Sequence, residues 1–261
     1  MQITFLGTGA ADTPVVLPQQ YQAAFSKEIR RNSSILVQDW LMIDCGPHAL
    51  YSLELLHADL SKITDLCVTH THADHIDPAA VARLAALRKK PLRIWCDAGA
   101  VPVFSEIANV DIHPLRAGQE RSIGECSVIP LSANHLVENT DEQPLHYLLE
   151  YRGKRFFYGC DGAWIQAGSF LILQQHRPLD LMIFDATVGR EDEGIRLGSH
   201  NSLAMLELML PLLKRCQIAS EQTKIILSHM AITLHQPHDN IVKEMEPKGF
   251  IVAYDGLTIS F

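Results

Sequence analysis

The sequence lacks any apolar run long enough to cross a membrane. No stretch of its 261 residues approaches the roughly 18 uninterrupted apolar residues that a membrane-spanning helix needs. The first residues, from Met1 to Gly7, show no basic region followed by a long apolar segment. We therefore expect a soluble cytoplasmic protein with no membrane partner.

Cysteines at the spacing of a metal or redox motif are also absent. The six cysteines are scattered, mostly in apolar surroundings, and no pair has the C-x-x-C spacing. Because a thiol packs well as a small core side chain, we expect buried free thiols rather than disulfides or a cysteine metal cluster. The six are Cys45, Cys67, Cys96, Cys126, Cys160 and Cys216.

Basic residues are fewer than acidic residues in this chain. The chain has 22 Lys and Arg against 30 Asp and Glu, which gives a net charge of −8. Binding to a phosphate backbone normally draws on clustered Lys and Arg. The sequence therefore predicts no extended nucleic-acid surface, although a small anionic substrate stays compatible with it if metals supply the local positive charge.

The glycine-rich stretch after the first predicted strand matches no nucleotide-binding motif. Residues 2–6 alternate polar and apolar side chains as a strand does, and Gly7 and Gly9 follow. Neither a Gly-Lys-Ser/Thr triplet nor a third glycine opening a helix comes next. By itself the stretch predicts a tight turn, of the kind that glycine permits beside a site.

The most informative segment runs from His70 to His75 and reads His-Thr-His-Ala-Asp-His. Neutral imidazole and carboxylate are the preferred ligands of zinc and of metals such as manganese or iron. The apolar run 66–68 predicts a strand before the segment, and the apolar spacing over 76–87 predicts a helix after it. The alternative, a solvated polar turn, gives no reason for such dense histidines.

Polar side chains also follow several other predicted strands. His135, Asp161 and His229 each lie just past the C-terminal end of an apolar run typical of a strand. Polar groups at strand ends collect at one edge of a sheet, where α/β proteins form their sites. Together with His70 and His72, these residues predict a shared metal centre.

The remaining chain alternates predicted strands and helices without a linker or low-complexity segment, which favours a single α/β domain over residues 1–261. Helices are expected over 98–108 and 164–176. A charged loop is expected over 186–198, followed by a strongly apolar helix for which Ser199 is a plausible N-cap.

The ligand pattern resembles the metallo-β-lactamase superfamily, whose H-x-H-x-D-H signature the segment 70–75 contains. The resemblance covers essentially the whole chain, because the later histidines and aspartates recur in order and Asp44 precedes a Cys-Gly pair upstream. It implies a four-layer αββα sandwich. It also implies two divalent metal ions, zinc or manganese, one held by His70, His72 and His135 and the other by Asp74, His75 and His229, with Asp161 bridging.

Within the superfamily, the chain looks like the RNase Z and PhnP phosphodiesterase branch. The features that carry this likeness are Leu6 to Gly9 with Pro14, Arg31 to Ser34, Asp185 at a strand end, His200 before the apolar helix, and the C-terminal run 249–259. Two features depart from the branch. Residues 15–35 contain no cysteine, where PhnP-type proteins commonly carry a zinc-binding loop, and no insertion resembles the basic arm of RNase Z.

The resemblance implies a metal-dependent phosphodiesterase that hydrolyses a small nucleotide or ribose phosphodiester, cyclic ones included, with a water activated by two metals. Asp74 and His200 would be catalytic, with His200 acting as a general acid or a phosphate clamp; a capping or surface histidine is the alternative. Arg31 and Gly9 would join His200 in binding the substrate, unless Arg31 is a surface charge. Asp44 and Asp185 would support the metal ligands, although Asp185 also fits a structural role.

Three other functions remain open. The same ligands suit an RNase Z-like RNA-processing endonuclease, a lactone or thioester hydrolase on the same dimetal fold, or a metal-loaded binding protein. A homodimer is common in the resembled families and stays open as well. The sequence does not indicate the physiological substrate or the native metal.

Overall fold

The computed structural model describes residues 1–139, 141–190 and 198–261, so the predicted loop 186–198 lies mostly outside the described residues. The chain forms two compact units. The first unit comprises residues 1–116, 137–143 and 254–260, and the second comprises residues 117–136, 144–253 and 261. Each unit contains one seven-stranded sheet. The expected single domain stays a prediction.

The sheet of the first unit has the strand order β14-β1-β2-β3-β4-β5-β6. β1 and β3 are each antiparallel to β2 and hence parallel to one another, and β3 to β6 are mutually parallel. The loops that follow β1, β3, β4 and β5 therefore leave from the same edge. The strands are β1 Gln2–Gly7, β2 Ser34–Val37, β3 Leu41–Ile43, β4 Asp65–Cys67, β5 Leu92–Asp97, β6 Val110–Leu115 and β14 Thr258–Ser260.

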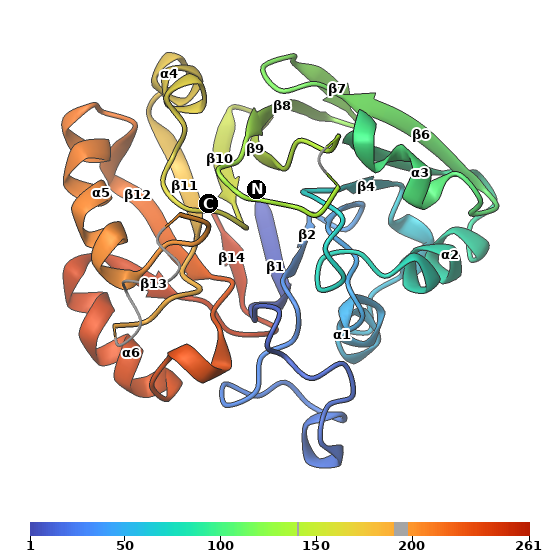
Figure 1. Cartoon of the computed structure of the whole chain (residues 1–261), viewed down its shortest axis with the longest axis horizontal. Coiled ribbons are helices and arrows are strands. Elements are labelled where there is room, and N and C mark those ends of the chain that lie inside the picture. The colour runs from blue at the N-terminus through green and yellow to red at the C-terminus, as the bar shows by residue number, and fades with distance from the viewer. Residues whose placement is uncertain (140, 191–197) are drawn as a thin grey trace. The chain divides into compact units, whose positions relative to one another are not determined.

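The first unit contains the α-helices α1 Ala49–Leu55, α2 Pro78–Ala86 and α3 Val101–Phe104. All three are labelled in Figure 1. α2 begins where the Asp77 carboxylate accepts the Ala79 backbone N–H at 2.9 Å and Pro78 occupies the first turn. Val81 and Leu84 on its inner face are fully buried.

The helix predicted over 98–108 is shorter than expected. It consists of a short 3-10 turn, Ala98–Ala100, followed by α3. After Phe104, residues 105–109 are exposed or half-buried, so no apolar face holds a longer helix against the sheet. Asn109, at a positive φ of 60°, then turns the chain into β6, a strand that the sequence did not predict.

The sheet of the second unit has the strand order β13-β12-β11-β10-β9-β8-β7. β10 to β13 are parallel, and β8 is parallel to β10 because both are antiparallel to β9. The C-terminal ends of β8, β10, β11 and β12 therefore share one edge. The strands are β7 Arg121–Ile123, β8 Cys126–Ser132, β9 Leu145–Tyr151, β10 Lys154–Gly159, β11 Leu179–Asp185, β12 Ala219–Ser228 and β13 Phe250–Val252.

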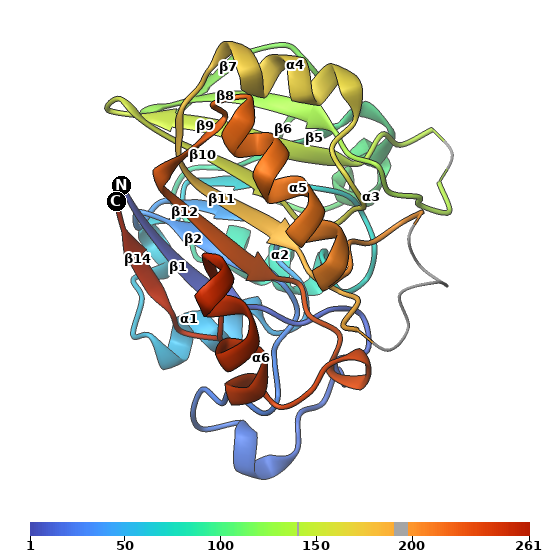
Figure 2. The same cartoon turned by 90° about the vertical axis from the view of Figure 1, so that its left-hand side faces the viewer.

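Helices α4 Ala167–Gln175, α5 Leu203–Arg215 and α6 His238–Met245 lie across one face of this second sheet (Figure 2). The predicted strongly apolar helix is α5, whose Leu206 and Leu213 are almost fully buried. The predicted N-cap is wrong: Ser202 caps α5 by accepting the Met205 backbone N–H at 3.2 Å, so the helix begins three residues beyond the position that Ser199 implied.

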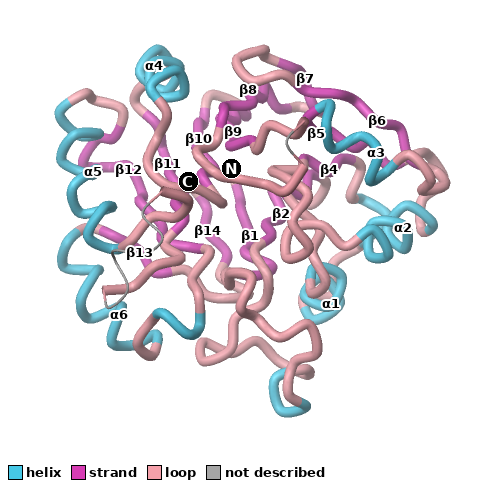
Figure 3. The backbone as a smooth tube through the Cα atoms, in the orientation of Figure 1, coloured by secondary structure: helices cyan, strands magenta, loops and turns pink. Residues whose placement is uncertain are grey.

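Outside these elements the backbone runs mainly as loop, including most of residues 8–33 (Figure 3). Short 3-10 turns are η1 Gln19–Tyr21, η2 Leu60–Lys62, η3 Ala98–Ala100, η4 Ile232–Leu234 and η5 Glu246–Lys248. All six cysteines are free, and five are buried, as predicted. None of the described helices has the length and apolar character to span a membrane.

A buried carboxylate, Asp65 on β4, connects two strands of the first sheet. It accepts hydrogen bonds from Arg93 Nε at 2.7 Å and Trp95 Nε1 at 2.8 Å, both on β5, and from Thr64 Oγ1. Burial opposes ionisation of Asp65, but these hydrogen bonds outweigh it and lower the pKa below the ordinary value of 3.8.

Replacing Asp65 with Asn should lower the free energy of unfolding by about 2 kcal/mol at neutral pH, because a hydrogen bond to a charged partner is lost. The ionised form stabilises the fold above pH 3.8, and this contribution disappears as the pH falls through the lowered pKa. The difference between the variant and the wild type in urea unfolding should therefore shrink below pH 3.8. Asp111→Asn, at an exposed position on β6, is the control; an equal loss in both variants would contradict this account.

Candidate functional site

The H-x-H-x-D-H segment lies directly after β4, at the edge of the first sheet where β1, β3 and β5 also end. His70 Nε2 lies 2.9 Å from His72 Nδ1, and His75 Nε2 lies 3.6 Å from Asp74 Oδ2. Ligand atoms around a tetrahedral zinc ion stand about 3.4 Å apart, since each lies about 2.1 Å from the metal. Both pairs are therefore near the separation of ligands that share an ion.

Asp44, which follows β3, holds the two ends of the 69–75 stretch in place. Its Oδ1 accepts the Thr69 backbone N–H at 2.8 Å, and its Oδ2 lies 2.8 Å from His75 Nδ1. Both side chains are fully buried. A carboxylate on one ring nitrogen fixes the orientation of an imidazole and leaves the other nitrogen free for a metal. The contact expected of Asp44 as a supporting carboxylate is therefore present.

Gly46 permits the close approach of the segment to the loop after β3. A Cβ atom at this position would lie 2.1 Å from the Asp74 carbonyl oxygen, which is backbone and has no room to move. Any side chain here would displace Asp74, one of the predicted ligands.

A second group of candidate ligands lies in the second unit, where β8, β10, β11 and β12 end. One ligand atom each of Asp161, Asp185, His200 and His229 lies within 4.8 Å of the others. Asp161 Oδ2 lies 3.4 Å from His135 Nε2 and 3.5 Å from His229 Nε2. These separations match the edges of a tetrahedral ligand shell.

Asp185 and Thr187 hold this group in place. Asp185 Oδ1 accepts the Thr187 backbone N–H at 2.6 Å, and Asp185 Oδ2 accepts the Gly162 backbone N–H at 2.9 Å. The Thr187 hydroxyl lies 2.7 Å from His229 Nδ1, which leaves His229 Nε2 facing Asp161. Asp185 thus contacts the segments that carry Asp161 and His229, and its role as a supporting carboxylate stays a prediction.

His200 is clamped between two carboxylates. Its Nδ1 lies 2.7 Å from Asp161 Oδ1 and 3.0 Å from Asp185 Oδ2. Burial opposes protonation of His200, but the two carboxylates outweigh it and raise its pKa to about 11. Burial likewise opposes ionisation of Asp161, yet the surrounding histidines lower its pKa, whereas burial and the Asp161 charge raise the pKa of Asp185.

These donors suit a divalent metal ion. The ligand atoms are imidazole nitrogens and carboxylate oxygens, and the lowered pKa of Asp161 favours its ionised form. His75 and His229 each contact an oxygen atom through Nδ1, which orients the ring so that Nε2 would meet a metal. Both units therefore present residues that could hold metal at the C-terminal edges of their parallel strands.

Arg31, predicted to contact substrate, is only 1% exposed. Its Nη2 donates to the Tyr21 carbonyl at 3.0 Å, its backbone N–H donates to Asp255 Oδ2 at 2.7 Å, and its guanidinium lies 3.8 Å from the same carboxylate. The side chain therefore anchors the 8–33 segment to the residues before β14. This placement gives the predicted substrate contact no support.

Gly9, the other predicted substrate contact, is also engaged within the first unit. Its backbone N–H donates to the Arg31 carbonyl at 2.7 Å, and its carbonyl accepts the Ser33 backbone N–H at 3.0 Å. A Cβ atom at Gly9 would lie 2.5 Å from Thr13 Oγ1. The glycine thus serves the close packing of the loop, and no free backbone donor of Gly9 supports substrate binding.

His146, which the sequence analysis did not single out, supports the second group. Its Nε2 donates to the Asp161 carbonyl at 2.9 Å, and burial lowers its pKa to about 4, so the ring is neutral. His146 lies in the apolar strand β9, where no spacing separates it from a core residue.

Glu142 is a second residue that the sequence did not single out. Its side chain is 6% exposed, and its Oε2 accepts the Thr71 hydroxyl at 2.5 Å, between His70 and His72. Burial raises the pKa of Glu142. Glu138, on the same 137–143 segment, lies 3.2 Å from His72 Nε2 but its side chain is 91% exposed.

The 137–143 segment is fixed against the turn after β5. Gln143 N donates to Asp97 Oδ1 at 3.1 Å, and Asn139 Nδ2 donates to the Gly99 carbonyl at 3.0 Å. A Cβ atom at Gly99 would lie 2.4 Å from the Asp141 carbonyl oxygen, so the close approach requires glycine. The turn thereby sets the position of Glu142.

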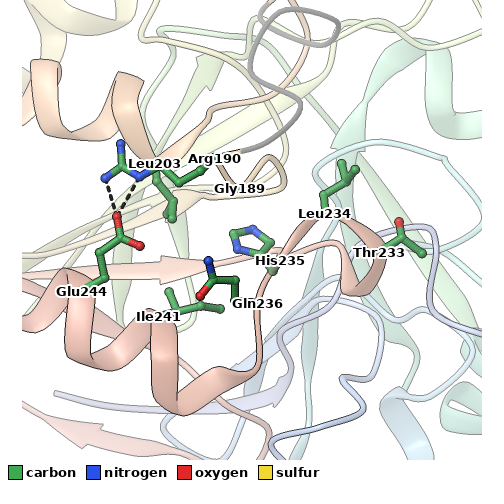
Figure 4. Close-up of a pocket in the computed structure, with 9 residues that line it drawn as sticks. All are labelled: Gly189, Arg190, Leu203, Thr233, Leu234, His235, Gln236, Ile241 and Glu244. Carbon is green, nitrogen blue, oxygen red and sulfur yellow. Dashed lines mark hydrogen bonds and ion pairs between the residues drawn. The ribbon is translucent and has the colours of Figure 1, made fainter.

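A pocket in the second unit is lined by residues of the segments that follow β11 and β12, together with residues of α5 and α6 (Figure 4). His235 lines it and donates from Nε2 to the Ala186 carbonyl at 2.7 Å, next to Asp185. Arg190 on the opposite wall pairs with Glu244. His235 therefore lines a pocket and contacts the chain that carries Asp185 and Thr187.

Comparison with known proteins places the chain in a family. A family model described as a beta-lactamase superfamily domain matches residues 39–230. Ribonuclease Z of Methanococcus maripaludis is 32% identical over 118 residues, which cover 44% of this chain and 35% of that protein. The chain thus matches about a third of the length of this curated relative.

Solved structures share the fold across the whole chain. The metallo-beta-lactamase fold protein YhfI from Bacillus subtilis has a TM-score of 0.73 at 17% identity and covers 99% of each chain. A diphosphatase from the PhnP family has a TM-score of 0.71 at 19% identity and covers 100% of this chain and 97% of that chain. Identities this low bear on the fold alone.

The chain belongs to the beta-lactamase superfamily, because the family model matches most of its length. The predicted superfamily and the predicted metallo-β-lactamase fold class are confirmed. The named relatives, a ribonuclease and a diphosphatase, are hydrolases, in agreement with the predicted class of enzyme.

Replacing Glu142 with Ala should weaken binding of Zn²⁺ or Mn²⁺ about tenfold, because its carboxylate fixes Thr71, the residue between the candidate ligands His70 and His72, and losing such support around metal ligands typically costs 10-fold or more in affinity. Titration of the metal-free protein in chelator-buffered metal measures the effect. Glu106→Ala, at an exposed position beyond α3, is the control, and its affinity should change less than about threefold. Equal affinities in both variants and the wild type would refute a positioning role for Glu142.

Proposed function

We propose that this protein is a metal-dependent phosphodiesterase that hydrolyses a small nucleotide or ribose phosphodiester, cyclic ones included. The proposal joins the superfamily membership to the residues at the strand ends of each unit. The observation that carries it is His200, a half-buried imidazole whose Nδ1 lies 2.7 Å from Asp161 Oδ1 and 3.0 Å from Asp185 Oδ2.

A fixed imidazolium suits a phosphodiester better than a carboxyl ester. Charge-assisted hydrogen bonds to phosphate oxygens are among the stronger polar contacts in proteins. The side chain of His200 is 17% exposed, and its Nδ1 is held by Asp161 and Asp185, so Nε2 is the nitrogen that would meet the substrate. His200 would hold a proton at Nε2 for a phosphate oxygen or for the leaving oxygen.

The metal ligands in this proposal follow the family resemblance. One divalent ion would be held by His70, His72 and His135, the other by Asp74, His75 and His229, with Asp161 between them. Two such ions would supply activation of water and neutralisation of phosphate charge. Zinc and manganese both suit the donor set.

The chain's own residues would keep this arrangement rigid. Asp44 orients His75, Thr187 orients His229, and Asp185 holds His200. Preorganised donors stabilise a developing charge without reorganising during the reaction. The catalytic contribution of Asp44 and Asp185 would thus be made through the histidines that they contact.

RNA processing is the second candidate function. The identity with ribonuclease Z supports it, although the aligned part covers only 35% of that protein. The net charge of −8 favours the small substrate, since an extended RNA normally requires a basic surface.

A substrate panel separates these functions. Protein reconstituted with Mn²⁺ or with Zn²⁺ should hydrolyse bis(p-nitrophenyl) phosphate and nucleoside cyclic phosphates, and removal of metal with a chelator should abolish turnover. Cleavage of precursor transfer RNA with higher kcat/KM would favour the endonuclease. Turnover of lactones or thioesters without any phosphodiester turnover would overturn the proposal, and a preparation that holds metal without hydrolysing any substrate would favour a binding protein.

His200→Ala should lower kcat on a phosphodiester about 100-fold, because a general acid or anion contact of this kind typically contributes at least that factor. The metal content measured by elemental analysis should stay at the wild-type level. His176→Ala, at a half-buried histidine at the C-terminal end of α4, is the control. Loss of metal from the His200 variant would instead make His200 a metal ligand, and unchanged kcat would exclude both roles.

A further inference from the structure

Trp164 is an exposed aromatic side chain three residues after Asp161. It lies in the loop between β10 and α4 and keeps 41% of its surface accessible. Large aromatic side chains are usually well buried because they gain most from leaving water. Its exposure beside the polar edge of the second sheet therefore needs a cause.

The backbone of Trp164 is held in an unfavourable conformation. Its φ of +54° lies in the left-handed region, which bulky L-residues rarely adopt. Such a conformation persists where surrounding contacts impose it, and it concentrates at functional sites. The chain thus keeps a large side chain at a position where glycine or asparagine would be easier to accommodate.

The hydrogen bonds that hold this segment come from Asn201. Asn201 Oδ1 accepts the Trp164 backbone N–H at 2.8 Å, and Asn201 Nδ2 donates to the Gly162 carbonyl at 3.0 Å. Asn201 is the neighbour of His200 in the chain. The segment that presents Trp164 is therefore clamped directly to the segment that presents His200.

A second exposed apolar side chain lies on an adjoining segment. The Ala163 backbone N–H donates to the Asn134 carbonyl at 3.1 Å, and Gln166 Nε2 donates to the Ala133 carbonyl at 2.9 Å. Residues 133–136 and 163–166 therefore lie side by side. Leu136, next to His135, is 79% exposed. Apolar surface thus borders the candidate ligands His135 and Asp161 on two adjoining segments.

We propose that the Trp164 indole stacks on the base of a nucleotide substrate, which makes the substrate a base-bearing phosphodiester rather than a base-free ribose phosphate. The inference rests on the proposed function, because it assumes phosphodiester hydrolysis at this edge. An exposed aromatic ring whose backbone is hydrogen-bonded to the segment that carries His200 offers a base a platform, and such stacking tolerates any base.

The test compares two cyclic diesters, adenosine 2′,3′-cyclic phosphate and the base-free glycerol 1,2-cyclic phosphate. Trp164→Ala should raise KM for the adenosine compound about tenfold, as expected for a lost stacking contact, with kcat within about twofold. KM for the glycerol compound should stay unchanged. Trp164→Phe should restore most of the affinity, and Leu171→Ala, at an exposed position on α4, should behave like the wild type.

Trp164→Gly guards against loss of folding. Glycine adopts a positive φ without penalty, so this variant should have a melting temperature at least as high as that of the wild type. It should nevertheless show the same rise in KM as Trp164→Ala. Equal KM changes for both diesters, or none for either, would overturn the stacking proposal.

A binding measurement separates this inference from the proposed function. The chain has three tryptophans, so quenching of fluorescence by adenosine 5′-monophosphate can be compared between the wild type and Trp164→Phe. Quenching that depends on Trp164, without turnover of any diester, would sustain base binding and refute the phosphodiesterase. Diester turnover with neither Trp164-dependent quenching nor a Trp164-dependent KM would refute the stacking and sustain the phosphodiesterase.

Discussion

Two buried carboxylates, Asp44 and Asp185, organise the polar edges of the two sheets. Each is fully buried where a parallel strand ends, and each accepts the backbone N–H of a threonine. Each also contacts a histidine ring, His75 in one unit and His200 in the other. A buried carboxylate is costly unless such partners satisfy it. The loops that carry the histidines therefore cannot shift without leaving a buried charge unpaired, and both units use this same device.

The ligands at strand ends were accessible to sequence reasoning because two physical rules act on them at once. Apolar runs buried on both faces mark parallel strands, and the C-terminal ends of parallel strands meet at one edge. Asp161 and His229 follow such runs, so their gathering could be predicted without coordinates. Asp44 and Asp185 were expected from the family resemblance, and strand ends alone did not distinguish them from structural carboxylates.

Other features depend on contacts that no local pattern reports. Glu142 reaches Thr71 across 71 residues of sequence, from a segment without periodicity. Arg31 looks like a surface charge until Asp255, 224 residues away, is placed beside it. The cap of α5 was misplaced by three residues because Ser199 and Ser202 have equal capping propensity, and only the backbone geometry distinguishes them. The half-exposed strand β6 has too few buried positions to give a clear alternation.

The contacts of Asp255 also bear on how the protein is made. Thr8 and Arg31 reach this carboxylate across 247 and 224 residues, and β1 takes β14 as its outer partner. Contacts so distant along the chain close late, because the loop entropy must be overcome first. During synthesis, the outer edge of β1 would therefore stay unpaired until residues 254–260 leave the ribosome. The 8–33 segment would lack its contacts with Asp255 for the same time.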